Sequence, residues 1–425
     1  MNMTKAEIIT IGTEIMLGQI IDTNTAYISR ILAEKGIRVA FQTSVGDEKE
    51  TIKSALKIAK ERATLIITTG GLGPTENDIT REAVSELYGV RLISDGEAYK
   101  QIQKYRELHH AEIRVGDRRQ TLIPEGALVL SNGNGTAAGF VLCQDGICLV
   151  CLPGVPGEMR AMFHKYVETF ARESSTKEGC IVTRQMHTFG ISERLVEDRM
   201  QNLKLQDDRV GLMTLVHDGI VTIHIRVTAR ERDAGLKHLD RVEQELRQEF
   251  GQAVFSTDDG SLEHAVAGLL KKRNKTIAVS ESCTGGLVSD KLTNISGISA
   301  FLVEGVVAYS NKAKVDLLGV PEEFLGKHGA VSPQVAFSMA EGVKKKASAN
   351  IGVGITGIAG PTGATKEKPV GLVYIAVIVD DRAAIKECRF RGSRVDIKNF
   401  SANTALNMVR LKLDASFCSD DLLSC

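Results

Sequence analysis

A glycine-rich segment in the first third of the chain carries the first candidate for chemistry. Gly70-Gly71-Leu72-Gly73-Pro74-Thr75 follows the short apolar run 65–69, and Asp78 stands just beyond it. At the carboxyl end of a parallel strand, glycines let backbone N–H groups approach an anion, and a helix N-terminus behind them favours negative charge. The segment therefore predicts a phosphate or pyrophosphate site.

Two carboxylates are expected beside these glycines. Asp47 follows the preceding strand-like run, so Asp47 and Asp78 would converge at one edge of a sheet. Mg²⁺ commonly takes one or two carboxylates together with substrate phosphate oxygens, and the pair therefore predicts a divalent-metal site. The alternative is that both aspartates are helix N-caps, a position that Asp favours. The loop fits neither the Walker A nor the dinucleotide-binding glycine pattern.

The last third of the chain offers nucleophiles. Cys283 lies in Ser280-Glu281-Ser282-Cys283-Thr284-Gly285-Gly286, before a helix whose N-terminus would lower the pKa of a thiol. No histidine lies near it in sequence, and a tight strand-to-helix turn of small residues is the favoured interpretation. The glycine-rich stretch 354–363 has N–H groups that could bind phosphate or stabilise an oxyanion, or it is a structural turn.

The elements that position these residues form three regions. Apolar runs at 7–11, 37–43 and 65–69 alternate with helical patterns at 24–35 and 48–60, and this order predicts a parallel, doubly wound α/β sheet. Gly36 is expected to cap the first of these helices. The same region continues with a helix at 78–87, strands and hairpins over 128–152, and a helix at 156–171.

A polar stretch at 172–179 is expected to be a linker. Beyond it, two strands around His217-Asp218-Gly219, an earlier strand and two helices predict a small α+β unit. The remainder predicts a second α/β layer structure, with helices at 261–273, 332–346 and 395–411 and strands at 277–280, 306–309, 351–355, 372–379 and 384–390.

Composition limits the possible partners and location. The 425 residues contain 53 basic and 53 acidic side chains, so net charge gives no attraction to nucleic acid or to an anionic membrane. The longest apolar run, 372–379, is far shorter than the roughly 20 residues that span a bilayer. No leader segment is evident, and a cytoplasmic location is expected.

The cysteines are expected to be reduced. Eight cysteines scattered through a long chain fit free thiols better than a disulfide framework. Cys148 and Cys151 lie in an apolar strand, where positions three apart point to opposite faces, so they are expected to be core residues and not metal or redox ligands.

Four motifs of the first region resemble the molybdopterin-binding-like domain of the CinA family of competence/damage-inducible proteins. They are GTEIMLGQIIDTN at 12–24, VGD at 45–47, the glycine segment, and LPGVPGEM at 152–159. The resemblance extends to the end of the chain and implies a metal-dependent pyrophosphatase acting on ADP-ribose. It implies Asp47 and Asp78 as ligands of Mg²⁺ or a transition metal, and substrate contacts from Gly70, Gly71, Gly73, Thr75 and Asn24.

The last region resembles the nicotinamide-nucleotide amidohydrolase domain of the same family, through residues 280–286, 297–301, 308–314, 328–332, 356–361 and 368–371. The resemblance implies Ser299 as nucleophile, with Tyr309, Lys314 and Arg394 as assisting catalytic residues. Arg394 could hold the nucleotide phosphate. A lysine with a depressed pKa can take the serine proton directly or through a tyrosine oxygen. Without the resemblance, Ser299 would be interpreted as a helix N-cap. Substrate contacts are implied at Thr284, Gly285, Thr356, Gly357 and Gly360, with no cofactor.

The expected organisation has three domains: residues 1–172 molybdopterin-binding-like, 173–256 a KH-like linking domain, and 257–415 the α/β amidohydrolase. The linking domain lacks a GXXG loop, so RNA binding is not expected; its roles would be spacing and dimerisation, giving a homodimer. The expected function is pyridine-nucleotide salvage, through deamidation of nicotinamide mononucleotide and hydrolysis of ADP-ribose. The alternative is a non-catalytic pterin- or nucleotide-binding protein that acts in competence or DNA repair through a protein partner.

Overall fold

The computed structural model describes residues 5–35, 37–113, 115–174, 180–203, 209–257 and 260–414. By its internal contacts the chain divides into two units, residues 1–182 with 227–237 and residues 183–226 with 238–425. None of the helices in these described ranges is long and apolar enough to cross a membrane. Gly36, expected as a helix C-cap, and residues 175–179 of the expected linker lie outside the described residues.

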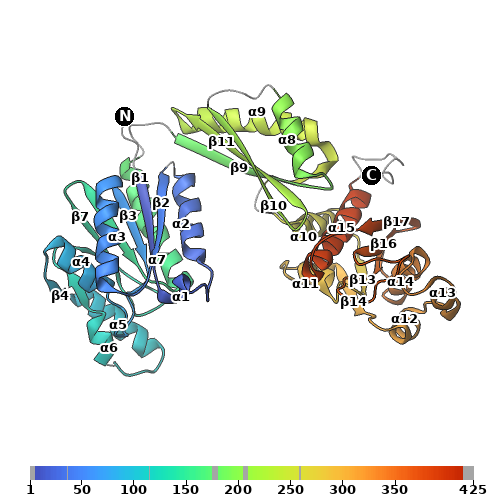
Figure 1. Ribbon diagram of the computed structural model, residues 1–425, viewed down its shortest axis with the longest axis horizontal. Helices are drawn as coiled ribbons and strands as arrows, with labels where there is room; N and C mark the ends of the chain where they lie inside the picture. Colours follow the sequence, from blue (N-terminus) through green and yellow to red (C-terminus); the bar gives the residue numbers. More distant parts are fainter. Residues whose placement is uncertain are drawn as a thin grey trace. The chain divides into compact units, whose positions relative to one another are not determined.

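The N-terminal region is the expected doubly wound α/β fold (Figure 1). Its sheet has the order β2-β1-β3-β8-β7-β6, in which β2, β1, β3 and β8 run parallel, β7 pairs antiparallel with β8, and β6 pairs antiparallel with β7. The strands are β1 (Lys5–Ile11), β2 (Arg38–Val45), β3 (Leu65–Thr69), β6 (Leu128–Leu130), β7 (Gly139–Gln144) and β8 (Ile147–Leu152).

Helices cover both faces of this sheet, which is why its central strands are continuous apolar runs. Ile8 and Ile67 pack under helices α2 (Thr23–Glu34) and α7 (Pro156–Ser174). Ile9 and Ile66 point the other way, under α3 (Lys49–Arg62) and α4 (Thr80–Tyr88). Shorter elements complete the region: α1 (Thr13–Met16), β4 (Leu92–Ser94), α5 (Gly96–Leu108), α6 (Val115–Arg119) and β5 (Leu122–Pro124).

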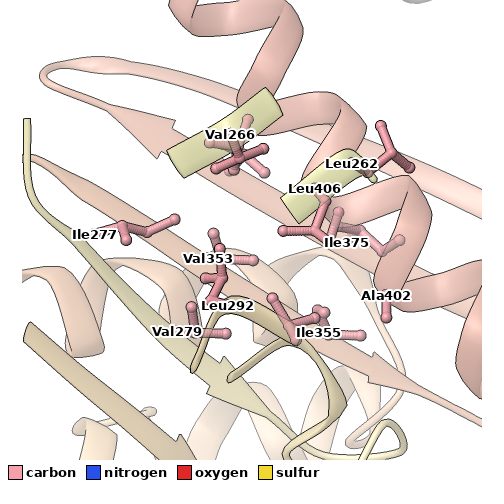
Figure 2. Packing of buried hydrophobic residues seen from close by; sticks show 14 of the residues in the cluster. Leu262, Val266, Ile277, Val279, Leu292, Val353, Ile355, Ile375, Ala402 and Leu406 are labelled. Carbon is pink, nitrogen blue, oxygen red and sulfur yellow. The ribbon is translucent and has the colours of Figure 1, made fainter. Parts of the chain in front are cut away.

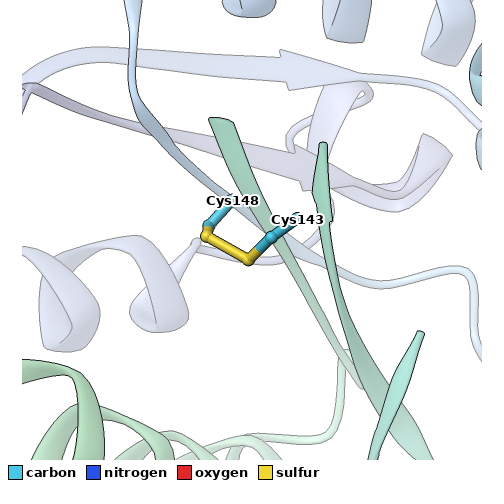
Figure 3. The surroundings of a disulfide bond; sticks show 2 residues. All are labelled: Cys143 and Cys148. Atoms are coloured by element: carbon cyan, nitrogen blue, oxygen red, sulfur yellow. A yellow bond between two sulfur atoms is a disulfide. The ribbon is translucent and has the colours of Figure 1, made fainter. Parts of the chain in front are cut away.

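The β7–β8 hairpin corrects the expectation of reduced thiols. Asp145 and Gly146 form its two-residue turn with positive φ, so Cys143 and Cys148 lie directly opposite each other. Figure 3 shows their disulfide bond, across a Cα–Cα distance of 4.2 Å. The expectation considered only spacing along one strand and missed this cross-strand register. Cys151 is buried as expected, but Cys148 is a disulfide partner at the edge of the core.

The middle region is a four-stranded sheet of order β10-β11-β9-β12, with helices α8 (Glu193–Asn202) and α9 (Arg232–Phe250). Its strands are β9 (Cys180–Phe189), β10 (Val210–His217), β11 (Ile220–Ala229) and β12 (Val254–Ser256), the last preceded by the short helix η1 (Gly251–Ala253). Asp218 and Gly219 form the expected turn between β10 and β11, again with positive φ. β12 was not expected; it pairs antiparallel with β9.

The C-terminal sheet has the order β14-β13-β15-β16-β17, with β13 parallel to both of its neighbours and the last two strands antiparallel. Figure 2 shows its core under the helices α10, α11 and α15, where Val266, Leu292 and Leu406 meet strand residues such as Val353. The strands are β13 (Ile277–Glu281), β14 (Leu302–Val307), β15 (Ile351–Gly357), β16 (Leu372–Val379) and β17 (Arg382–Arg389). The helices are α10 (Leu262–Arg273), α11 (Leu287–Thr293), η2 (Ile298–Ala300), α12 (Asn311–Leu318), α13 (Glu322–His328), α14 (Pro333–Lys346) and α15 (Arg394–Leu413).

One expected strand is misplaced. A strand was expected at 306–309, but β14 ends at Val307, and Ser310 caps α12 by accepting a hydrogen bond from the N–H of Ala313 (3.0 Å). Tyr309 therefore lies in a strand-to-helix connection and is 62% exposed. A tyrosine in such a connection can reach a ligand, which a tyrosine inside a paired strand would do less readily.

Candidate functional site

The glycine segment of the N-terminal region is a loop that only glycine can form. Gly70 has φ 113°, and a Cβ atom there would lie 2.0 Å from the carbonyl oxygen of Ile11. Gly71 also has positive φ, and the Oγ1 of Thr80 donates to the Gly70 carbonyl (3.0 Å). The loop follows β3 at the carboxyl edge of the parallel strands, where open α/β sheets bind their ligands.

Asp78 shapes this loop from within. One carboxylate oxygen accepts from the Gly73 N–H (2.7 Å), and the other accepts from the N–H (2.9 Å) and the hydroxyl (2.5 Å) of Thr75. Asp78 is thus not the N-cap of α4, a position held by Ile79. Its carboxylate is committed to the backbone that it folds.

Asp47 has a similar structural partner. It accepts a hydrogen bond from the N–H of Thr13 (2.8 Å), the first residue of α1, and its own N–H donates to the Thr13 hydroxyl (3.3 Å). Glu48, not Asp47, is the N-cap of α3. Both aspartates therefore hold loops at the sheet edge, and the N-cap alternative is not what the structure has.

The expected metal ligands fit a divalent cation poorly. In the described ranges, no three His, Cys, Asp or Glu side chains are arranged so that they could hold a metal ion together. Both oxygens of Asp78 accept loop hydrogen bonds, so its coordination would compete with the contacts that shape the loop. Asp47 is left as the more available of the two carboxylates. A cation here would depend mainly on substrate phosphate oxygens and water, as Mg²⁺ often does.

Asn24 ties three segments together at the same edge. Its Nδ2 donates to the Thr69 hydroxyl (2.9 Å) and to the Gly154 carbonyl (2.8 Å). Its Oδ1 is buried and has no hydrogen-bond partner among the described residues. Gly154 in turn approaches Gly70, since a Cβ on Gly154 would lie 3.5 Å from the Gly70 Cα. The starts of α2 and α7 therefore border the glycine loop.

In the C-terminal region, Glu281 builds the loop that carries the serines. This carboxylate is fully buried at the end of β13 and accepts from the N–H groups of Gly286, Val288 and Ser289 (3.0–3.1 Å). It also accepts from the Ser289 hydroxyl (2.9 Å). Glu281 thus satisfies the donors at the start of α11 and fixes the turn in between.

A lysine–serine pair lies inside this turn. Lys314 is 1% exposed, and its Nζ donates to the Ser282 Oγ (3.0 Å) and to the carbonyl oxygens of Ala308 (2.9 Å) and Tyr309 (3.4 Å). No carboxylate pairs with it among the described residues. Burial lowers the pKa of Lys314, with the Cys283 thiol acting weakly in the opposite direction. The geometry suits a proton acceptor beside a hydroxyl.

Arg394 and Tyr309 form a second pair. Arg394 Nη2 donates to the Tyr309 hydroxyl oxygen (3.0 Å), and Nη1 donates to the Gly360 carbonyl (2.6 Å). Arg394 is the first residue of α15, whose start is fixed by a capping box between Ser393 and Asp396. The guanidinium is held yet exposed, as recognition of an anion requires.

The implied substrate-binding residues are distributed around these pairs. Thr284 is fully buried, its Oγ1 has no hydrogen-bond partner within the described part of the chain, and Gly285 has positive φ. Thr356 donates to the Ala330 carbonyl (2.8 Å), so its hydroxyl is used within the fold. A Cβ on Gly357 would lie 2.6 Å from the Val373 side chain.

Ser299 and Cys283 are placed differently from the lysine–serine pair. Ser299 is exposed in the short helix η2, and no hydrogen bond of the described residues joins it to Lys314 or Tyr309. Cys283 is buried, and burial raises the pKa of its thiol to about 12, so a reactive thiolate is not favoured. The turn interpretation of this segment is the better one.

Ser282 is the residue that sequence reasoning missed. The segment contains Ser280 and Ser282, and only the structure separates them: the Ser280 hydroxyl donates to the Val353 carbonyl within the sheet (2.8 Å). The signal that could have found Ser282 is the end of the strand. Ser280 lies within β13, whereas Ser282 is the first residue beyond it, and its hydroxyl contacts Lys314.

Comparisons with known proteins assign three successive segments between residues 7 and 413. Residues 7–173 match the family described as probable molybdopterin binding domain, residues 183–256 the damage-inducible protein CinA KH domain, and residues 259–413 the CinA C-terminal domain. A putative competence-damage inducible protein of Acetivibrio thermocellus is 41% identical, over 95% of this chain and 98% of its own. A CinA-like protein of Kosmotoga olearia is 40% identical, over 96% of this chain and 99% of its own. The crystal structure of a CinA protein with unknown function from Thermoplasma acidophilum is 33% identical, with a TM-score of 0.37, over 40% of this chain and 98% of its own.

Proposed function

Because this chain belongs to the CinA family, we propose that its C-terminal region hydrolyses the carboxamide of nicotinamide mononucleotide, giving nicotinic acid mononucleotide and ammonia. The observation that carries the proposal is the buried contact between Lys314 and Ser282. A lysine held beside a hydroxyl, without a carboxylate partner and with its pKa lowered by burial, is equipped to accept a proton.

The proposed reaction uses two serines in separate roles. Ser299 is exposed and reachable by substrate, so we keep it as the nucleophile whose Oγ bonds to the carboxamide carbon. Ser282 is nearly buried and suits a relay that passes the Ser299 proton to Lys314. The proton then goes to the leaving nitrogen, which departs as ammonia, and water hydrolyses the resulting ester.

Arg394 is proposed to bind the nucleotide phosphate. Its contacts with Gly360 and Tyr309 fix the guanidinium, and the residue as a whole is exposed. Tyr309 would be oriented by the same contact. The test is ammonia release from nicotinamide mononucleotide by the full chain, with Lys314→Met as the inactive comparison; a fully active Lys314→Met would contradict the proposal.

For the N-terminal region we propose hydrolysis of ADP-ribose with a divalent metal, Mg²⁺ or a transition metal. Support comes from the glycine loop at the sheet edge and from the unpartnered Oδ1 of Asn24, which could accept a hydrogen bond from a ribose hydroxyl or bound water. The hydrogen bonds between Asp78 and the loop favour the competing function, in which the region binds a pterin or nucleotide without turnover. In that case the protein would act in competence or DNA repair through a protein partner. Incubation of the full chain with ADP-ribose and each of several divalent metals separates the two.

The remaining expectations are also proposals. We propose that the protein is a homodimer, that the middle region serves spacing and dimerisation, and that it does not bind RNA. Net charge of zero supports the last point. Analytical ultracentrifugation tests the first, and a filter-binding assay at two salt concentrations tests the last.

A further inference from the structure

Glu158 lies at the carboxyl edge of the N-terminal sheet, on the first turn of α7. β8 ends at Leu152 beside Thr69 of β3, so the segment 153–158 leaves the sheet next to the glycine loop. The connection between β6 and β7 reaches the same edge, because Leu130 at the end of β6 pairs with Gly139 at the start of β7. Three loops therefore meet where Glu158 stands.

The carboxyl of Glu158 differs from that of Asp78, which accepts three hydrogen bonds. It is partly buried and receives one hydrogen bond, from the neutral amide of Asn132 (2.6 Å). Among the described residues no lysine, arginine or histidine forms an ion pair with it. Burial raises its pKa, against the smaller opposing effect of the Asn132 hydrogen bond. A carboxyl with one neutral partner retains lone pairs for a further proton or ligand.

The surroundings of this carboxyl are built to hold it. A Cβ atom at Gly135 would lie 2.4 Å from the Glu158 carboxyl group, so this carboxyl lies directly against the Gly135 backbone and would have to shift if a larger residue stood there. Asn132 is itself fixed: its Nδ2 also donates to the Ala137 carbonyl (3.0 Å), and its N–H donates to the Gln101 side chain (2.8 Å). Such second contacts orient a side chain at a functional site.

A continuous set of contacts joins this cluster to the glycine loop. Arg81, almost fully buried at the start of α4, donates through Nη2 to the Leu72 carbonyl of the glycine loop (2.8 Å) and to the Ala138 carbonyl (3.4 Å). Ala138 follows Ala137, which accepts from Asn132. The Glu158 cluster and the predicted phosphate loop are thus linked through Arg81 and the backbone at Ala137 and Ala138.

We propose that Glu158 is the general base of the N-terminal site, accepting a proton from the water that attacks the pyrophosphate. This role rests on the proposed hydrolysis of ADP-ribose. In the step, the water oxygen bonds to one phosphorus while the bond from that phosphorus to the bridging oxygen breaks. The water proton goes to Glu158 and is later released to solvent, and the bridging oxygen leaves with the other phosphate.

The test is Glu158→Gln in the full-length protein, assayed with ADP-ribose and a divalent cation. The amide keeps the shape and can accept from Asn132, but it cannot take the proton. We expect kcat to fall by about 10²- to 10⁴-fold, while KM, the thermal midpoint and calorimetric binding of ADP-ribose stay unchanged. Glu158→Asp keeps a carboxylate and should therefore retain more activity than Glu158→Gln. The thermal midpoints of the two variants show whether either one is misfolded. Glu125→Gln, an exposed glutamate of the same region, is the matched control and should behave as the wild type.

Each other outcome overturns the role. If kcat of Glu158→Gln stays within twofold of wild type, Glu158 is not the general base. If excess metal restores the activity of that variant, Glu158 is a metal ligand. If ADP-ribose binding weakens by the same factor as kcat falls, Glu158 is a binding residue. If the wild type itself never cleaves ADP-ribose with any metal, the proposed reaction fails and the role with it. Wild-type turnover therefore distinguishes the two failures.

Discussion

Lys314 Nζ and Ser282 Oγ lie 3.0 Å apart, although 32 residues separate them along the chain. Two independent devices produce this contact. Glu281 fixes the turn after β13 that carries Ser282, and the Ser310 cap sets the start of α12 that carries Lys314. The pair is therefore a consequence of two helix starts, and a change at either helix start would move one member away from the other.

Lys314→Met should greatly slow deamidation while the chain stays folded. Methionine fills nearly the same volume and has no amine to accept a proton, so kcat should fall by about 10²- to 10⁴-fold. Ammonia release measures kcat, and circular dichroism checks the fold. Lys312→Met, on the exposed side of the same helix, is the matched control. Equal losses in both variants would show a general effect on α12.

The pH dependence should report the same lysine. Only neutral Lys314 accepts a proton, and its neutral fraction increases as pH rises through its pKa. Burial lowers that pKa, so activity should rise at a lower pH than an exposed lysine would give. The kcat–pH profile of the full chain measures this. An activity that falls across the alkaline range while the protein stays folded would contradict a neutral lysine as base.

Ser299→Ala and Ser282→Ala should differ in kind. Loss of the nucleophile should remove the covalent intermediate and lower turnover by several orders of magnitude, whereas loss of a relay should slow its formation. Rapid-quench mass spectrometry of the full chain looks for the acyl-enzyme in each variant. If the Ser299→Ala variant still carries an acyl group on Ser282, then Ser282 is the nucleophile and Ser299 is the relay. Cys283→Ala should stay active, because the Cys283 thiol is buried and protonated.

Features that depend on neighbouring residues could be predicted from the sequence, whereas contacts between residues far apart in the chain could not. Alternation of apolar residues such as Ile8 and Ile9 predicts the strand and both covered faces, because that pattern is local. The Cys143–Cys148 bond and the Lys314–Ser282 contact depend on register and on helix starts, which a linear pattern does not encode. Asp78 shows the reverse case: its position was expected, but its three loop hydrogen bonds give it a different task from the one that spacing predicted.

Asp78→Asn tests that task. Asparagine has a single acceptor oxygen, so at least one contact with the Gly73 or Thr75 N–H is lost, each worth about 0.5–1.5 kcal/mol. ADP-ribose turnover should fall, and excess metal should not restore it. If excess metal restores the turnover of Asp78→Asn, Asp78 is a metal ligand after all.

EDTA should stop ADP-ribose cleavage in the wild type and leave deamidation unchanged.

Residues 183–425 should release ammonia as well as the full chain does, whereas residues 257–425 should be less stable. α15 depends on the middle region: Arg410, nearly buried, donates to the Val254 (3.1 Å) and Gln252 (2.6 Å) carbonyls, and Asn403 donates to the Asp218 carbonyl (2.9 Å). Cutting at 257 removes these acceptors and exposes the face of α15 that they cover, so three hydrogen bonds are lost, each worth about 0.5–1.5 kcal/mol. Thermal midpoints and ammonia release of the two fragments measure this. A 257–425 fragment as stable as 183–425 would show that α15 needs no support from the middle region.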